Sequence, residues 1–200
     1  MSGHYYSENP DAKSNPKTWT FVLRDRELKF TSDAGVFSKK EVDFGSRLLI
    51  EEFVFPSISG DCLDVGCGYG PIGLALAKEE ESRRFLMVDV NERALELTRE
   101  NAKKNGITNV EARKSNLFDG VQESEFAAIL TNPPIRAGKK VVHQLFEDSY
   151  GKLQTNGELW IVIQKKQGAP SAIDKLESVF DEVETVSKSK GYFIIRAKKC

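Results

Sequence analysis

Residues 61–73, DCLDVGCGYGPIG, combine a carboxylate with closely spaced glycines, a pattern that suits a nucleotide-binding turn. A short apolar run ends at Asp64, and glycines follow at positions 66, 68, 70 and 73. The last three match the spacing G-x-G-x-x-G, in which glycine permits a positive φ or a close approach to a ligand. The pattern predicts a buried strand, a tight loop and a helix start. It leaves open which nucleotide is bound.

Two carboxylates bear on that choice. Asp89 ends the next apolar run, 19 positions after Gly70, a separation that suits hydrogen bonds to ribose hydroxyls. The alternative is that Asp89 only caps a helix that begins near Asn91. Asp64, at the mouth of the loop, would repel a pyrophosphate but attract the ammonium and sulfonium groups of S-adenosylmethionine. Asp89 suits the ribose of either cofactor, and Asp64 favours S-adenosylmethionine over NAD.

The sequence Asn132-Pro133-Pro134 closes a later apolar run and is suited to holding an amine. The lone pair of an exocyclic amine on a base is delocalised into the ring, so two acceptors on its N–H bonds would favour the nucleophilic geometry. The Asn132 side chain and the Pro133 carbonyl supply acceptors, and the prolines lack donors and fix the backbone. Methyl transfer then needs proximity and alignment, with no metal. The alternative is a turn that merely ends a strand.

Alternating strands and helices must position these residues. The predicted strands are 61–65, 85–89, 110–115, 126–131 and 159–163, and the predicted helices are 71–80, 91–105, 138–151 and 171–180. This alternation predicts a parallel sheet covered on both faces, with ligands at the carboxyl ends of the strands. Residues 182–187 and 191–195 predict a terminal hairpin whose last strand runs antiparallel.

The N-terminal part of the chain has a different pattern. Residues 1–17 are polar, 19–23 and 27–30 predict a hairpin, and a helix is expected from Lys40 to just before Pro56. We therefore divide the chain into an N-terminal arm, hairpin and helix, 1–55, packed on a catalytic domain, 56–200, as one structural unit.

Composition restricts the class of protein. Two hundred residues with 40% hydrophobic content suit one domain with a real core. The net charge of −1 means that contact with nucleic acid must rely on local patches. Three cysteines without a paired or zinc-binding pattern favour a reducing compartment, and neither a signal peptide nor a membrane-spanning run is evident. We expect a cytoplasmic protein.

The segment from Asp64 to Gly70 resembles motif I of the class I S-adenosylmethionine-dependent methyltransferases, and the alternation over 60–197 is similar to their seven-stranded, Rossmann-like α/β sheet. The resemblance implies that Asp64 orients the methionine ammonium group. It also implies that the loop approaches the methionine part, that the end of the second strand binds the ribose, and that a later loop, with Asn where Asp is usual, lies beside the adenine. The residues concerned are Gly66, Cys67, Gly68, Gly70, Asp89, Val90, Ser115, Asn116 and Leu117.

The sequence from Asn132 to Ile135 resembles motif IV of amino methyltransferases that act on guanine N2, adenine N6 or glutamine amides, with Ile135 at a position that is commonly aromatic. Residues 35–49 are similar to the segment that precedes motif I in RsmC-type guanine-N2 methyltransferases of small-subunit ribosomal RNA. This resemblance implies that Phe37 and Phe44 border the cofactor and the target base. Either an apolar contact from Ile135 suffices, or an aromatic side chain from the N-terminal segment, such as Phe37, Tyr5 or Tyr6, takes the place of the missing one.

Basic residues follow two of the predicted strands and indicate a phosphate-contacting rim, the alternative being solvated loop lysines. They are Arg136, Lys139, Lys140, Lys165 and Lys166. The sequence thus predicts methyl transfer to guanine N2 of 16S ribosomal RNA, with ribosomal RNA or the small subunit as partner. Glutamine-amide or adenine-N6 methylation is the nearest alternative. An NAD-dependent oxidoreductase and a non-catalytic RNA-binding module are more distant ones.

Overall fold

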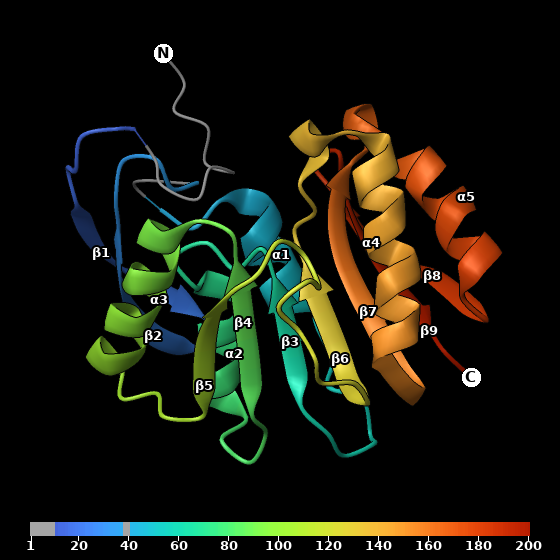
Figure 1. Ribbon diagram of the computed structural model, residues 1–200, viewed down its shortest axis with the longest axis horizontal. Helices are drawn as coiled ribbons and strands as arrows, with labels where there is room; N and C mark the ends of the chain where they lie inside the picture. The colour runs from blue at the N-terminus through green and yellow to red at the C-terminus, as the bar shows by residue number, and fades with distance from the viewer. Residues whose placement is uncertain (1–10, 38–40) are drawn as a thin grey trace.

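The computed structural model describes residues 11–37 and 41–200, so most of the predicted arm, with Tyr5 and Tyr6, lies outside the described residues. The core is a seven-stranded sheet (Figure 1), in which six strands run parallel and β9 alone runs antiparallel. This confirms the predicted fold class and the terminal hairpin. Across the sheet the strands are β5 (Val110–Lys114), β4 (Phe85–Asp89), β3 (Cys62–Val65), β6 (Phe126–Thr131), β7 (Leu153–Gln164), β9 (Tyr192–Lys198) and β8 (Glu182–Ser189).

Apolar cores form on both faces of the sheet, which explains why strands such as β3 and β6 are buried along their whole length. One core contains side chains of α1 (Phe44–Glu52), α2 (Pro71–Glu79) and α3 (Glu92–Lys104). The other contains side chains of α4 (Lys139–Lys152) and α5 (Ala169–Val179). None of the helices in the described part of the chain is long and apolar enough to cross a membrane.

A two-stranded hairpin, β1 (Lys17–Leu23) and β2 (Arg26–Ser32), packs beside α3 (Figure 1). The Asn101 side chain on α3 joins this hairpin to the glycine loop. Its amide nitrogen donates to the carbonyls of Thr31 and Tyr69, both at 2.9 Å, and its oxygen accepts from the Thr31 N–H at 2.8 Å. The hairpin therefore carries residues 33–37 to the edge of the sheet where the glycine loop lies. The predicted boundary at residue 55 stays a prediction.

Two elements start four or more residues away from the predicted position. The helix expected from Lys40 begins at Phe44, because Asp43 is its N-cap and accepts a hydrogen bond from the Ser46 N–H at 3.0 Å. The strand expected from residue 159 begins at Leu153, although residues 154–158 are mostly polar. There, hydrogen bonds pair Asn156 N with Lys199 O and Lys199 N with Gly157 O, extending β7 along β9. Ladder pairing overrides the polar composition.

Candidate functional site

A cavity of about 460 Å³ opens where β3 and β6 lie side by side, the point at which the strand order reverses. Such switch points are the usual ligand sites of open α/β sheets. Fourteen of the residues predicted for the site line its wall, from five separate segments of the chain. They are Phe37, Gly66, Cys67, Gly68, Asp89, Val90, Ser115, Asn116, Leu117, Asn132, Pro133, Pro134, Ile135 and Arg136.

The glycines of the loop have two different structural roles. Gly66 and Gly68 have φ values of +73° and +58°, and a Cβ added at either would meet no protein atom within 4 Å. Since both line the cavity, a side chain there would occupy ligand space. A Cβ at Gly73 would instead meet Met87 Cε at 2.5 Å, so this glycine allows α2 to pack on β4.

Four N–H groups of the loop, those of Gly66, Cys67, Gly68 and Gly70, are engaged within the protein. Gly66 and Cys67 donate to the Val88 carbonyl at 2.8 and 2.9 Å, and Gly70 donates to the Cys67 carbonyl at 3.0 Å. Gly68 donates to the Asp89 carboxylate at 2.8 Å. A phosphate-binding loop directs such groups at its ligand. This loop therefore suits a ligand without phosphate at that position.

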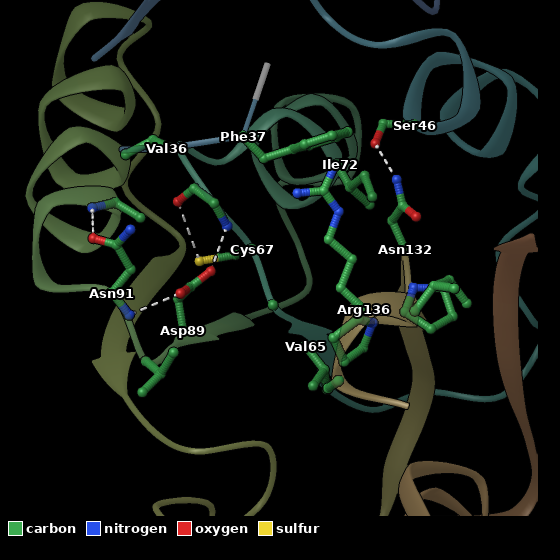
Figure 2. A pocket seen from close by; sticks show the side chains of 18 of the residues that line it. Val36, Phe37, Ser46, Val65, Cys67, Ile72, Asp89, Asn91, Asn132 and Arg136 are labelled. Atoms are coloured by element: carbon green, nitrogen blue, oxygen red, sulfur yellow. Dashed lines mark hydrogen bonds between the residues drawn. The ribbon is translucent and has the colours of Figure 1, made fainter. Parts of the chain in front are cut away.

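Asp89 is fixed at the wall of the cavity (Figure 2). One carboxylate oxygen accepts from Gly68 N and the other from Asn91 N, both at 2.8 Å. The N-cap of α3 is Asn91, whose side chain accepts from Ala94 N, so Asp89 is not the helix cap. Burial raises the pKa of Asp89, and the backbone hydrogen bonds oppose that rise. Each oxygen retains acceptor capacity for a ligand hydroxyl.

Asp64 does not lie at the mouth of the loop, where the sequence placed it. Its side chain is fully buried, and one oxygen accepts from Gly73 N at 2.9 Å. The other oxygen has no hydrogen-bond partner among the described residues. Burial raises the pKa of Asp64 to about 7. Gly70, at φ +104°, is the N-cap of α2, and like Asp64 it is not among the residues that line the cavity.

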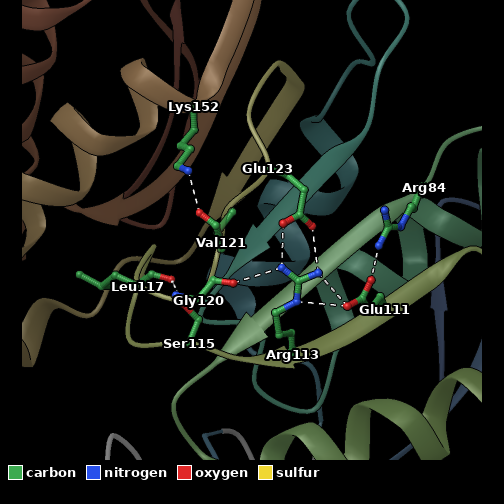
Figure 3. A network of polar contacts seen from close by, with 9 residues as sticks. All are labelled: Arg84, Glu111, Arg113, Ser115, Leu117, Gly120, Val121, Glu123 and Lys152. Atoms are coloured by element: carbon green, nitrogen blue, oxygen red, sulfur yellow. Dashed lines mark hydrogen bonds and ion pairs between the residues drawn. The ribbon is translucent and has the colours of Figure 1, made fainter.

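The loop after β5 is shaped by its own hydrogen bonds (Figure 3). The Ser115 hydroxyl donates to the Leu117 carbonyl at 2.6 Å and accepts from Gly120 N at 2.7 Å. The Arg113 guanidinium donates to the Gly120 carbonyl at 3.1 Å and to Glu123 at 2.8 and 2.9 Å. Hydrogen bonding to Arg113 lowers the pKa of Glu123 to about 2. Residues 115–117 are thereby presented to the cavity in a fixed conformation.

On the other side of the cavity, the Asn132 amide is oriented by the N-terminus of α1. Its nitrogen donates to the Ser46 hydroxyl at 3.2 Å (Figure 2). The same nitrogen lies 3.5 Å from an Asp43 carboxylate oxygen. Ser46 also hydrogen-bonds to the Asp43 carboxylate through its side chain, while burial raises the pKa of Asp43. Because acceptors hold the nitrogen end of the amide, its oxygen is left for a donor.

The backbone after Asn132 supplies further acceptors. The Pro133 carbonyl accepts from Ile135 N and the Pro134 carbonyl from Ala137 N, both at 2.9 Å, as the chain enters the short 3₁₀ helix η1 (Ile135–Ala137). A carbonyl oxygen has two lone pairs, so each can take one more donor. Arg136 extends from η1 across the cavity in the direction of Phe37 (Figure 2).

The sequence did not identify two residues on this side, Gln164 and Tyr192, which line the cavity from β7 and β9. The Gln164 side-chain oxygen is buried without a hydrogen-bond partner among the described residues. The sequence signal that could have identified Tyr192 is topological. Because the last strand is antiparallel, its first residue lies at the carboxyl edge of the parallel strands. Phe44, which was predicted here, is not on the wall: its ring packs against Tyr192, with centroids 5.4 Å apart.

The remaining predicted basic residues do not line this cavity. Lys139 and Lys140 start α4, and Lys165 and Lys166 lie in η2 (Lys165–Gln167), directly after β7. All four are exposed, at the carboxyl edge of the sheet. The described residues contain no cluster of three or more His, Cys, Asp or Glu side chains suited to a metal ion.

Known proteins share this architecture. The family model described as methyltransferase small domain matches residues 27–196. Bacillus subtilis (strain 168) has a protein described as "Uncharacterized protein YbxB" that is 66% identical over the full length of both chains. Ribosomal RNA small subunit methyltransferase C of Vibrio parahaemolyticus is 32% identical over 92% of this chain and 53% of its own length.

A solved structure shares the fold over nearly the whole chain. It is the T. thermophilus 16S rRNA N2 methyltransferase RsmC in complex with AdoMet and guanosine, with a TM-score of 0.82 at 23% identity. The alignment covers 96% of this chain and 52% of RsmC, so this chain spans about half of each of the two ribosomal RNA methyltransferases. Because the family model matches most of the chain, the protein belongs to the methyltransferase small domain family, as the predicted resemblance to S-adenosylmethionine-dependent methyltransferases implied.

Proposed function

We propose that this protein transfers a methyl group from S-adenosylmethionine to an exocyclic amino group, namely N2 of guanine in 16S ribosomal RNA. The observation that carries the proposal is the fixed orientation of the Asn132 amide. Ser46 and Asp43 hold its nitrogen, so its oxygen is available to an incoming amine beside the Pro133 carbonyl. A pocket that presents acceptors in this way selects a donor such as –NH₂.

The other half of the cavity suits the cofactor. Asp89 has acceptor capacity for ribose hydroxyls, and the loop 115–117 forms a preshaped wall for the adenine. Asp64 lies beneath the loop, where a carboxylate favours a cationic ligand through the Coulomb interaction and disfavours a pyrophosphate. We assign Asp64 a positioning role, because it holds Gly73 at the start of α2.

For methyl transfer, the protein mainly has to position the amine against the methyl group of the cofactor. S-adenosylmethionine supplies a methyl group already activated by the sulfonium charge. Asn132 and the Pro133 carbonyl hold the two N–H bonds of the amine, so that its lone pair is directed at the cofactor half of the cavity. Alignment of two bound reactants alone removes a large part of such a barrier, by about 7–11 kcal/mol in favourable cases. Pro134 and Ile135 give the acceptor side of the cavity an apolar lining.

Ribosomal RNA is the favoured acceptor for two reasons. Both relatives of known name described above are methyltransferases of small-subunit ribosomal RNA, and one of them is solved with guanosine. Two of the aromatic residues that line the cavity, Phe37 and Tyr192, offer rings on which an unstacked base can rest where motif IV has Ile135. The proposed substrate places the activity in the cytoplasm.

The decisive experiment supplies labelled S-adenosylmethionine with small subunits, large subunits and naked 16S ribosomal RNA. We expect label in 16S RNA, recovered after nuclease digestion as N2-methylguanosine. The Asn132→Ala variant is the control for background transfer. Label recovered in protein as methylglutamine, or in RNA as N6-methyladenosine, would replace the proposed acceptor. Tight NADH binding without S-adenosylmethionine binding in calorimetry would overturn the proposal.

A further inference from the structure

The turn between β8 and β9 lies next to the acceptor side of the cavity. Lys190 and Gly191 form this turn, both at positive φ, +50° and +81°. Since β9 alone is antiparallel, the turn lies at the carboxyl edge of the parallel strands, and Tyr192 directly after it lines the cavity. A hydrogen bond of 2.8 Å from Lys165 N to the Gly191 carbonyl fixes the turn against η2.

Three segments at this edge carry cations and no carboxylates. Residues 136–142, 165–171 and 186–192 contain no Asp or Glu. The N-terminal turn of α4 and η2 are neighbours, because Lys139, Gln167 and Gly168 line one small cavity of about 280 Å³. With the link from η2 to the β8–β9 turn, the three segments form one continuous surface, here called the basic band. Its cations are Arg136, Lys139, Lys140, Lys165, Lys166, Lys188 and Lys190.

The lysine charges of the basic band are not paired with acids of the described chain. None of its six lysines makes an ion pair with another of the described residues. The ammonium groups of Lys188 and Lys190 instead lie over the rings of Phe193 and Phe44, each 4.7 Å from the centroid. These contacts hold the two cations without neutralising them. Large exposed apolar side chains of the described chain, Val22, Phe37 and Val54, lie outside the band.

A charged band without an apolar patch suits a phosphodiester backbone better than a protein surface, since interfaces between proteins usually have an apolar core. We propose that the RNA backbone on one side of the target nucleotide lies along the basic band, and that Lys188 and Lys190 on the β8–β9 turn contact its phosphates. This inference rests on the proposed function and extends the predicted rim onto a third segment. It also gives the RNA a direction of approach, over β7 and β9 rather than over the N-terminal hairpin.

The test is the salt dependence of RNA binding by the full-length double variant Lys188→Gln/Lys190→Asn. Asparagine tolerates the positive φ at position 190, so the turn is kept. Binding of a 16S ribosomal RNA transcript is measured over a series of KCl concentrations. We expect about tenfold weaker binding near 0.1 M salt and a log–log slope reduced by about 1.4, for two contacts at about 0.7 each to single-stranded RNA. The dissociation constant of S-adenosylmethionine should not change.

The matched control, Lys17→Gln/Lys29→Gln, removes two exposed lysines from the hairpin and changes the net charge equally. It should bind RNA with the wild-type slope. If the band variant also keeps the wild-type slope, or if both variants lose affinity alike, the inference is wrong even when the wild type methylates 16S RNA. If the wild type methylates no RNA, the proposed function itself fails. If label enters a protein and the band variant binds RNA like the wild type, the basic band is assigned to a protein partner.

Discussion

The two halves of the cavity are constructed in different ways. The half above β3, β4 and β5 is mainly backbone: a glycine loop whose N–H groups are engaged internally, and a short loop after β5 with its own hydrogen bonds. The half above β6, β7 and β9 depends on side chains from separated parts of the chain. Asn132 is oriented by Ser46, 86 positions earlier, and Tyr192 comes from the last strand.

This difference predicts how each half responds to substitution. A surface built around glycines is most sensitive to an added side chain, because a bound ligand would occupy the space that glycine leaves. A surface built from side chains is sensitive to loss of any member that orients another. The substitutions below are chosen to separate the two halves by their effects on cofactor affinity and on turnover.

The largest effect is expected for Asn132→Ala in the acceptor half. Removing one preorganised group that contacts the reacting atoms typically lowers kcat by about 10²–10³-fold. Cofactor affinity should stay within about threefold of wild type, since Asn132 acts on the amine. Single-turnover methyl transfer and calorimetry with S-adenosylmethionine measure the two quantities. A matching loss of cofactor affinity would show that the halves are not separable.

In the cofactor half, Gly68→Ala should have the opposite signature. Its Cβ would meet no protein atom, but it would enter ligand space at a φ of +58°, where alanine is strained by about 1–2 kcal/mol. We expect about 10- to 100-fold weaker binding of S-adenosylmethionine, with the RNA affinity unchanged. The control is Gly151→Ala on α4, where nothing lies within 4 Å and φ is not positive. That change should stabilise the fold by about 0.5–1 kcal/mol and leave binding intact. Equal effects of both substitutions would remove the argument for a ligand at Gly68.

The sequence predicted the backbone-built half well because its information is local. Strand, glycine loop and helix start follow each other within residues 61–73, so residue order alone places Gly66 and Gly68 at the cavity wall. The error at Asp64 has a physical cause. Alternation along β3 decides whether a side chain points to the cavity or beneath the loop, and a strand buried on both faces gives no alternation in polarity to read.

The acceptor half was predicted less completely because its contacts join distant positions. The motif at Asn132 was visible, but the support from Ser46 depends on how α1 packs, which no local pattern reports. Phe44 was predicted at the wall because the resemblance of residues 35–49 to the RsmC-type segment implied it. The structure gives that place to Tyr192, against which Phe44 packs.

Ser46→Ala tests whether the acceptor half depends on orientation. Without the Ser46 hydroxyl, the Asn132 amide loses its closest partner and can rotate, so we expect a decrease in kcat of about tenfold, equivalent to about 1.4 kcal/mol. Cofactor affinity and the RNA KM should change little. A purely structural role is excluded by a double-mutant cycle, because Ser46→Ala should have no further effect on kcat in the Asn132→Ala background. Additive effects in that cycle would contradict the positioning role.

The smallest effect concerns proton linkage in the cofactor half. The pKa of Asp64 is raised to about 7 and that of Asp89 is raised in the same direction, both mainly by burial. Because the folded protein holds these protons more tightly than the unfolded chain, the unliganded protein should lose stability as the pH rises from about 4 to 7. A cationic cofactor favours the ionised carboxylates, so its affinity should rise by about fivefold between pH 6 and 7.5, an increase bounded by tenfold per pH unit for one proton released. Calorimetry across this range measures the change, and Asp64→Asn should flatten it. If the pH dependence of cofactor affinity survives in Asp64→Asn, the titrating group is Asp89 instead. If the affinity falls as the pH rises, the ligand above these two acids is not cationic.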